Sequence, residues 1–483
     1  MRGLVFLAIY LGALSRVFFD PFIGILLWFW LSLMNPHRVI YGFAAGQNYA
    51  LPVAAITLVM WLVYALNKRE PRLPPSDRFT WLTLALMLWI CLSSLNGFGP
   101  PEEIMKGGGD AEKMLLMTLV AYTLCNTRKR FDLLVLVCVL SVAFYGFKGG
   151  IFSVLSGGSH RVQGPTSSMI ADNNVVGVAL AMTIPMLFYL QHRYPQHHLK
   201  WPMRAVIGFT TLGALFTYSR GTALALAAMT VMLCLRTRYK VATVVVIIIA
   251  AAGMWHYAPE KWFSRIDTIQ SYEQDNSANS RLWLWAVSWE IVKHSPIVGG
   301  GIHWGRNWPE ANRVIAGSGV APLVKPRAAH SIWFQQVSDH GFVGLFLFLG
   351  FFVIAAADSR WLIRHTRDKP SLAWGNHFGR MLQVSMVGFA VGGATVSLNM
   401  YDGFYAIVML GCIARRLVSA ELDAQAAAEA ASEVNAEAAA KDQTPVKTPA
   451  MANPLKRCPV APSSATNGAR GTLVILNGPP ARG

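Results

Sequence analysis

Three arginines and one histidine are the residues of this sequence best suited to chemistry. Arg161, Arg220 and Arg281 lie between apolar segments, and His330 stands at the start of another. A guanidinium group stays charged and offers phosphate oxygens a rigid pair of N–H donors. A neutral imidazole, whose pKa lies near physiological pH, can take a proton from a hydroxyl group. These residue types predict activation of a hydroxyl nucleophile beside a bound pyrophosphate.

Each of the four residues also has a simpler structural explanation. Arg220 can be an anchor whose side chain reaches the lipid headgroups, and Arg281 a solvated residue of a loop helix. Arg161 can belong to a loop ion pair, and a lone histidine at a helix start is more often a polar N-terminal residue than a catalyst. The chemical interpretation therefore depends on the elements that bring the four residues to the same side of the molecule.

Those elements are long apolar segments. Of the 483 residues, 54% are hydrophobic and only 14% are charged, whereas soluble domains carry about 25% charged residues. A membrane-spanning helix needs roughly 20 apolar residues, and backbone groups in hydrocarbon must bond within the helix. The sequence thus predicts an all-α integral membrane protein. Its apolar segments lie at approximately 3–18, 21–35, 49–66, 80–97, 112–126, 131–149, 172–190, 203–218, 221–236, 241–257, 331–357, 376–399 and 402–416.

The distribution of charge orients these segments. The formal net charge of +17 is concentrated in alternate short loops, which is the pattern of cytoplasmic loops rather than of a nucleic-acid-binding surface. The basic loops are 67–79, 127–130, 191–204, 236–240 and 358–369. The intervening loops, which include 150–171 and 258–330, then face outward and carry all four candidate residues. The first two apolar segments are short, so we expect about twelve transmembrane helices.

This topology divides the chain into four parts. Residues 1–257 and 331–418 form the N-terminal and C-terminal parts of a transmembrane bundle, and residues 258–330 form one large periplasmic loop with short helices. Six tryptophans lie in that loop, and residues 280–294 are expected to be a helix that ends before Gly299. Residues 419–483 begin with an Ala/Glu-rich stretch that can form a solvated helix, and their composition predicts a disordered cytoplasmic tail.

Several motifs of other chemistries are missing. The sequence has no GxxxxGK[ST] phosphate loop and no HExxH motif, and the acidic residues of the large loop are scattered rather than paired. Its six cysteines form no CxxC motif and none lies in the large loop. We therefore expect no nucleotide, no cofactor, no metal ion and no disulfide framework.

The order of four short motifs resembles the O-antigen ligase/polymerase superfamily of integral-membrane glycosyltransferases. His330 and Ser331, followed after nine residues by a GxxG that begins at Gly341, are similar to the ligase signature. An SRG tripeptide contains Arg220, and Arg281 begins an RxxxW segment that is followed by PxxGxG. The stretch from Arg161 to Gly164 and the run Asp172-Asn173-Asn174 resemble the block that precedes them. The resemblance covers roughly residues 20–417, and the motifs lie within 160–345.

The resemblance implies a substrate pair and a reaction. In this superfamily the donor is a glycan on undecaprenyl pyrophosphate at the periplasmic face of the bacterial inner membrane, and ligases transfer it to the lipid A-core oligosaccharide of lipopolysaccharide. The transfer is metal-independent and inverting, and it uses no nucleotide. Carried onto this sequence, His330 is the candidate general base. Arg220 and Arg281 are candidates for binding the pyrophosphate, with Arg161 as a third.

Other functions remain open. An O-antigen polymerase would join repeat units, and a protein O-glycosylation ligase would use a serine or threonine of a protein as acceptor. A lipid or sugar transporter would also have many spans and buried arginines, although transporters often consist of two similar halves, which this sequence lacks. Polymerised donor that accumulates in a deletion strain would favour the ligase.

Overall fold

The computed structural model describes residues 2–71, 73–99, 101–236 and 276–442. The expected span 241–257, the start of the large loop at 258–275 and the end of the tail at 443–483 lie outside the described residues. The chain divides into two units, residues 1–424 and residues 425–483, and the fold described below is that of the first.

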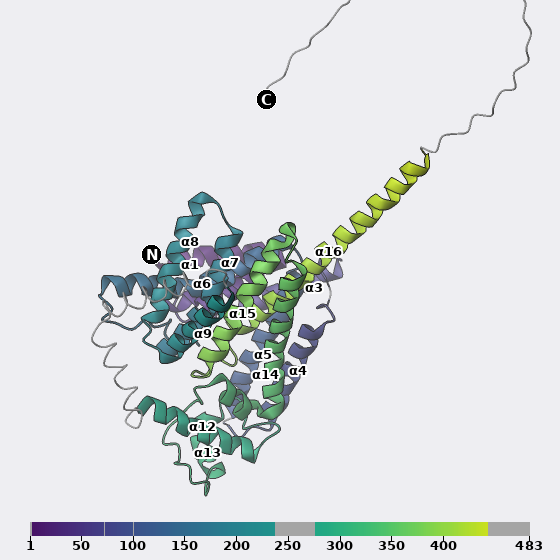
Figure 1. Ribbon diagram of the computed structural model, residues 1–483. Helices are drawn as coiled ribbons and strands as arrows, with labels where there is room; N and C mark the ends of the chain where they lie inside the picture. The colour runs from purple at the N-terminus through teal and green to yellow at the C-terminus, as the bar shows by residue number, and fades with distance from the viewer. Residues whose placement is uncertain (1, 72, 100, 237–275, 443–483) are drawn as a thin grey trace, which may run out of the picture. The chain divides into compact units, whose positions relative to one another are not determined.

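The described residues form helices and no strands, which confirms the all-α part of the predicted fold class (Figure 1). The helices of the first half are α1 (Arg2–Val17), α2 (Pro21–Phe29), η1 (Trp30–Met34), η2 (Pro36–Arg38), α3 (Ala50–Leu66), α4 (Arg78–Leu95), α5 (Pro101–Leu124), α6 (Arg128–Leu155), α7 (Asn173–Arg193), α8 (His197–Leu215) and α9 (Arg220–Arg236). Those of the second half are α12 (Asn276–His294), η4 (Trp304–Arg306), α13 (Trp308–Val314), α14 (Ile332–His365), η5 (Pro370–Leu372), α15 (Ala373–Gly393) and α16 (Asp402–Asp442). Every predicted apolar segment within the described residues contains a helix.

Side-chain caps fix where several of these helices begin. The Asp77 carboxylate accepts hydrogen bonds from two N–H groups in the first turn of α4, at Phe79 (3.0 Å) and Thr80 (3.1 Å). Asp20 accepts one hydrogen bond, from the Phe22 N–H in the first turn of α2 (3.0 Å), and Pro21 at the first position of that helix has no N–H that needs a partner. Such caps satisfy donors that the helix itself leaves free. Short polar residues before apolar runs therefore place the helix starts.

Among the described residues, five helices are long and apolar enough to cross a membrane, namely α4, α6, α7, α14 and α16, and the shorter α3 and α9 are also apolar. The large hydrophobic side chains that α4 exposes recur every three or four residues: Trp81, Leu84, Leu88, Leu92 and Leu95. Exposed apolar stripes of this kind suit contact with lipid rather than water. The chain is thus a membrane protein, and the total of twelve spans stays a prediction.

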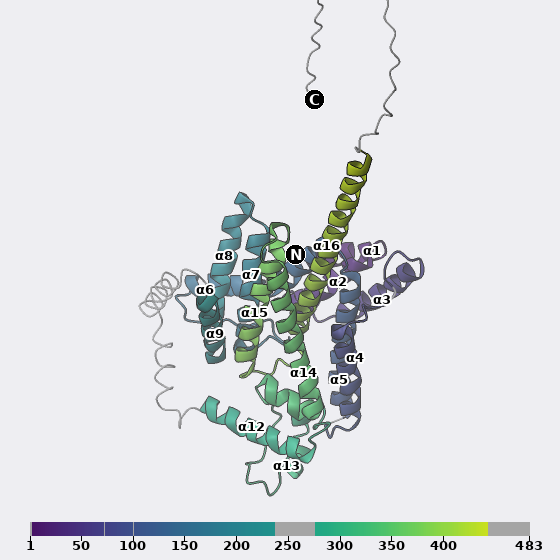
Figure 2. The same cartoon turned by 45° about the vertical axis from the view of Figure 1, so that its right-hand side comes forward.

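Helices α14, α15 and α7 lie side by side in the centre of the bundle, with α9 against α15 (Figures 1 and 2). Helices α6 and α8 approach each other so closely that a Cβ atom on Gly150 would lie 2.0 Å from the Phe209 carbonyl oxygen. Small residues at such a contact allow two backbones to pack closely, as is common between helices in membranes. This packing holds the loops on either side of α6 and α8 in fixed positions.

The described part of the large loop has a small hydrophobic core of its own. Buried side chains from α12, α13 and their neighbours form it: Leu284, Val287, Ile291, Trp304, Ala311, Ile315 and Leu323. Both views show α12 and α13 together near one end of α14 (Figures 1 and 2). The loop is therefore a folded cap that packs on the helices.

The two ends of the bundle can be named by their contacts. At the end that we call the Asp358 end, Asp358 of α14 pairs with Arg78 at the start of α4 and with Arg415 of α16, 2.8 Å away. At the other end, which we call the His330 end, α14 begins beside the end of α15, because the His330 N–H donates to Ser397 Oγ at 3.0 Å. Helices α7 and α9 also begin at the His330 end.

Candidate functional site

His330 immediately precedes α14 and is held by its backbone. Its φ of 50° lies in the left-handed region, which histidine, asparagine and aspartate enter more readily than most residues. Its N–H donates to Ser397 Oγ, and that hydroxyl in turn donates to Gln335 Oε1 at 3.0 Å. Gln335 Oε1 also accepts a hydrogen bond from the Ala329 N–H at 2.8 Å. Since the backbone makes these contacts, the imidazole is solvent-accessible and available for other partners.

Charged groups from three different elements surround this imidazole. Burial by the surrounding protein and the nearby guanidinium groups of Arg281 and Arg327 lower the pKa of His330, while Asp172 opposes them. A lower pKa keeps the imidazole neutral, and so able to accept a proton, at physiological pH. The structure thus brings together two of the predicted site residues, His330 and Arg281.

Arg327 belongs to this group although the sequence did not single it out. It lies in the irregular segment between α13 and α14, and its backbone N–H donates to the Gly305 carbonyl at 3.3 Å. Only two residues separate it from His330 in the chain, and this short separation is the one sequence signal that could have drawn attention to it. Its guanidinium adds a second positive charge beside the histidine.

The helix after His330 is broken at Gly341. There the backbone has φ 66° and ψ −171°, and the sequence had suggested one continuous helix. The segment that follows α12 docks into the break, where Gly300 N–H donates to the Ser338 carbonyl (2.8 Å) and Phe342 N–H to the Pro296 carbonyl (2.8 Å). A Cβ atom on Gly341 would lie 1.9 Å from the Ile297 carbonyl oxygen. Both glycine motifs therefore serve one contact, which joins the segment after α12, the helix of Arg281, to α14, the helix that follows His330.

His340, which follows in the same motif, is a structural residue. It is completely buried, its Nδ1 lies 2.6 Å from Ser93 Oγ, and its carbonyl accepts from Trp89 Nε1 at 2.8 Å. These contacts join α14 to α4. Of the two histidines in the motif, only His330 is open to a substrate.

Arg220 is the first residue of α9, and its side chain is exposed. Its neighbour Gly221 lies against the end of α15, where an added Cβ atom would come within 1.9 Å of Thr395 Oγ1. Asn173 of α7 donates to the Thr217 carbonyl at 2.8 Å and fixes the turn before Arg220. Arg220 therefore lies at the His330 end of the bundle, beside the segment that contains Ser397, whose hydroxyl oxygen accepts from the His330 N–H.

Arg161 lies apart from this group. It is exposed in the segment that follows α6, and it lines a separate pocket of about 290 Å³ with Arg38 and Lys148. The adjacent Val162 N–H donates to the Phe216 carbonyl at 3.0 Å, which links this segment to the end of α8. No contact between Arg161 and the surroundings of His330 occurs within the described residues.

The start of α7 is a helix N-terminus, where an anion could bind, and it is occupied by a carboxylate of the protein. Asp172 caps the helix, and its side chain accepts from the backbone N–H of Asn174 at 2.8 Å and from its amide at 3.0 Å. A carboxylate at a helix N-terminus is stabilised by the helix dipole, and it would repel a second anion. This finding does not support an anion site at that helix start.

Most of the described loop tryptophans contribute to packing. Trp304 is buried and donates to Ser338 Oγ at 3.0 Å, and Trp283 and Trp308 pack against the core of the cap. Trp285 stacks on Phe334 with ring centroids 5.1 Å apart. Trp289 is 45% exposed, and Trp262 lies outside the described residues. The aromatic content of the loop thus reflects mainly its own core.

Two family models match the chain. Residues 205–349 match the model described as O-Antigen ligase, and this range contains Arg220, Arg281, Arg327 and His330. Residues 1–195 match the model described as a family of unknown function (DUF5935). No protein in the curated set matches the chain. The first match supports a membrane enzyme of the O-antigen ligase/polymerase type.

Proposed function

Because the chain is a member of the O-antigen ligase superfamily through residues 205–349, we propose that it is a lipid-linked glycan ligase. It transfers a glycan from undecaprenyl pyrophosphate to a hydroxyl of the lipid A-core oligosaccharide. The reaction takes place at the His330 end, which faces the periplasm of a bacterial inner membrane. The observation that carries this proposal is the exposed position of His330, at a place where the guanidinium groups of Arg281 and Arg327 lower the pKa of its imidazole.

In the proposed reaction His330 takes the proton of the acceptor hydroxyl. The hydroxyl oxygen then attacks the anomeric carbon of the donor sugar from the side opposite the pyrophosphate, so a new glycosidic bond forms with inversion. The bond between the anomeric carbon and the pyrophosphate oxygen breaks, and undecaprenyl pyrophosphate leaves with the electron pair. Cations that bind the pyrophosphate stabilise the charge that develops on it in the transition state.

Arg220 and Arg281 are the proposed pyrophosphate ligands. The positive charge of Arg281 lowers the pKa of the His330 imidazole, and Arg220 is the first residue of α9 at the same end of the bundle. Their guanidinium groups match phosphate oxygens in pairs, and they make a metal ion unnecessary. Arg161 is proposed to contact the donor further from the reacting carbon, since it lies on a separate segment.

Transfer by the purified protein tests this proposal. The assay contains undecaprenyl-pyrophosphate glycan, lipid A-core acceptor and a chelator, without nucleotide. We expect product from the natural chain and a loss of about 10²–10⁴-fold in His330→Asn, because a positioned general base contributes about that factor. Asparagine tolerates the left-handed backbone of residue 330, so the melting temperature should not change, and His330→Ala serves as a second variant.

The same assay separates the related reactions. Product with a peptide acceptor and none with the lipid A-core would replace the ligase proposal with protein O-glycosylation. Extension of one donor glycan by another would favour the polymerase. Activity of His330→Asn equal to that of the natural chain would exclude His330 as the base. Movement of the donor across a membrane without any transfer would favour the transporter.

A further inference from the structure

The pocket that Arg161 lines, which we call the Arg161 pocket, has only positive charges in its described lining. These charges belong to Arg38 of η2, Lys148 of α6 and Arg161 itself, around a volume of about 290 Å³. All three side chains are exposed, and none forms an ion pair or a side-chain hydrogen bond among the described residues. Cations that line one hollow without a carboxylate create a positive potential that attracts an anion.

The location of these cations is not explained by membrane topology. Lysine and arginine are common in cytoplasmic loops, and at the Asp358 end arginines pair with a buried carboxylate. The Arg161 pocket lies at the other end, because residues 161–166 lead towards α7, which begins at the His330 end. That end is predicted to face the periplasm, so the positive-inside rule does not account for three cations there.

The backbone around the pocket is held in place. The Val162 N–H donates to the Phe216 carbonyl at 3.0 Å. A Cβ atom on Gly149 would lie 2.5 Å from Val162 Cγ1, so α6 packs directly on the segment that follows it. The Tyr145 hydroxyl donates to the Met34 carbonyl, which ties the residues before η2 to α6. An anion that binds here does not have to order the backbone first, and preorganisation of this kind favours binding.

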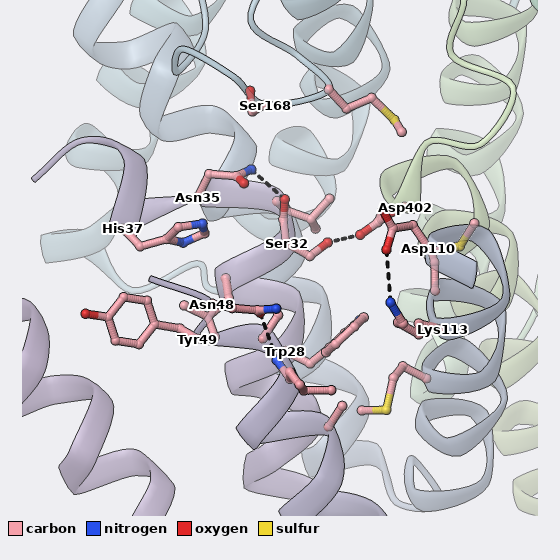
Figure 3. A pocket seen from close by; sticks show the side chains of 18 of the residues that line it. Trp28, Ser32, Asn35, His37, Asn48, Tyr49, Asp110, Lys113, Ser168 and Asp402 are labelled. Atoms are coloured by element: carbon pink, nitrogen blue, oxygen red, sulfur yellow. Dashed lines mark hydrogen bonds and ion pairs between the residues drawn. The ribbon is translucent and has the colours of Figure 1, made fainter. Parts of the chain in front are cut away.

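A larger pocket that Arg38 also lines does not neutralise its charge. Its volume is about 760 Å³ (Figure 3). Figure 3 shows that its other charged groups already have partners: Lys113 pairs with Asp110 at 3.1 Å, and Asp402 accepts from the Ser32 hydroxyl. Arg38 forms no ion pair with these or other described carboxylates. Its positive charge therefore contributes to the Arg161 pocket.

The anion that this pocket suits is not the pyrophosphate that leaves in the reaction. That pyrophosphate is bonded to the anomeric carbon, so it must lie beside His330 and Arg281 when the carbon is attacked. Arg161 has no contact with the surroundings of His330 among the described residues. The pocket is therefore suited to a negative charge at another place on the donor.

The rest of the lining suits a sugar. Gln163 and Thr166 have exposed side chains that both donate and accept hydrogen bonds, as sugar hydroxyls do. Tyr41 is 82% exposed and Phe152 48%, and such rings can lie against the apolar face of a sugar. Small-molecule sites range over roughly 300–1,000 Å³, so this pocket holds a single sugar more readily than a phospholipid with its acyl chains.

We propose that the Arg161 pocket binds a negatively charged group of the donor glycan, a carboxylate or a phosphate on a sugar beyond the reacting one. Arg38 and Arg161 offer paired N–H donors to such a group, and Lys148 adds a point charge. The proposal rests on the proposed glycan transfer, and it names the class of donor. The chain prefers an acidic glycan to a neutral one.

The test measures binding of two oligosaccharides of equal length to the full chain by calorimetry. One carries a uronic acid and the other is neutral. We expect the natural chain to bind the acidic oligosaccharide more tightly, and this preference to decrease as salt is added. Arg38→Gln, Lys148→Gln and Arg161→Gln should each raise the dissociation constant of the acidic oligosaccharide about tenfold, and that of the neutral one should not change.

Arg313→Gln is the matched control. Arg313 is an exposed arginine of the cap whose charge is already paired, with Glu310 at 2.6 Å. Its substitution removes the same charge from the chain outside the pocket, so the preference for the acidic oligosaccharide should persist. The three pocket variants should melt at the temperature of the natural chain, because their side chains are exposed and have no ion pair among the described residues.

Several results would overturn the proposal. They include equal binding of both oligosaccharides by the natural chain, a preference that the pocket variants keep, and an equal loss of the preference in Arg313→Gln. Variants that weaken binding of phosphatidylglycerol alone would assign the pocket to a lipid headgroup. Variants that weaken binding of phosphorylated core oligosaccharide alone would assign it to the acceptor. Either outcome would exclude the donor glycan.

Failure of this proposal can be told from failure of the proposed function. Transfer of acidic and neutral donors with equal KM by the natural chain would reject the pocket alone. A preference for the acidic oligosaccharide that the pocket variants abolish, in a chain that transfers no glycan, would reject the reaction alone.

Discussion

The two ends of the helical bundle use arginine differently. At the Asp358 end, arginines bond directly to buried carboxylates: Asp358 binds Arg78 and Arg415, Asp132 binds Arg128 (3.0 Å) and Arg193 (2.8 Å), and Glu70 binds Arg130 (2.6 Å). At the His330 end, Arg281 and Arg327 lie beside a histidine, and the nearby Asp172 is hydrogen-bonded by Asn174. Similar charges thus join helices at one end and shape the surroundings of an ionisable side chain at the other.

This difference shows that a loop's content of arginine does not reveal its role. Helices whose ends are joined by ion pairs with buried carboxylates are fixed relative to each other. An arginine beside a neutral imidazole adds positive potential at a place where an anionic leaving group can bind. We therefore expect substitutions at the His330 end to change activity, and substitutions at the Asp358 end to change stability.

Among the arginine substitutions, the largest effect is expected for Arg220→Lys. Lysine keeps the charge and loses the paired N–H donors, so the cost in kcat should approach the 10²–10³-fold that the loss of one transition-state donor produces. The measurement is the rate of transfer at saturating donor, together with the melting temperature. Full activity would mean that charge alone, or nothing, is needed at residue 220.

A smaller effect, on stability rather than on activity, is expected for Asp358→Asn. Asp358 is only 1% exposed, and its two arginine partners are partly exposed, so the loss of these charge-assisted bonds should cost about 1–3 kcal/mol. The melting temperature should fall, while the KM and kcat of the folded protein stay as in the natural chain. Loss of activity in a protein of unchanged stability would contradict the expectation that substitutions at the Asp358 end affect stability alone.

The smallest effect concerns the pH dependence of transfer. Because the pKa of His330 is lowered, the neutral base persists to a pH below the ordinary pKa of histidine, and activity should fall only when the pH drops through this lowered value. Arg327→Gln removes one of the charges that lower the pKa of His330. The acidic limb of the pH–rate profile should therefore move to higher pH, by less than about one unit. Asp172→Asn keeps a helix-capping residue, removes the opposing charge and should move the limb to lower pH.

An unchanged profile in both variants would contradict the assignment of this limb to His330. Shifts in opposite directions would support it, because a general loss of stability has no reason to produce opposite signs. The same profile measured for Asp358→Asn provides the control from the other end of the bundle.

The sequence alone predicted the helices. Apolar length and capping residues such as Asp77 and Asp172 depend on neighbours in the chain, so α4 and α7 begin within a few residues of the expected positions. The family resemblance also came from the sequence, and the match of residues 205–349 confirms it. The roles of His330, Arg220, Arg281 and Arg161 were predicted in the same way, and they stay predictions.

The tertiary structure decided how distant segments meet. Gly341 breaks α14 because residues 296–301 pack into the gap, and nothing next to Gly341 in the chain reveals that contact. Arg327 acts on His330 only because the segment before α14 folds back on the cap. A pocket that is lined by both Trp28 and Tyr401 joins residues more than 350 positions apart. Local patterns determine a helix because its hydrogen bonds are local, whereas a pocket and the pKa of a histidine depend on which side chains the fold brings together.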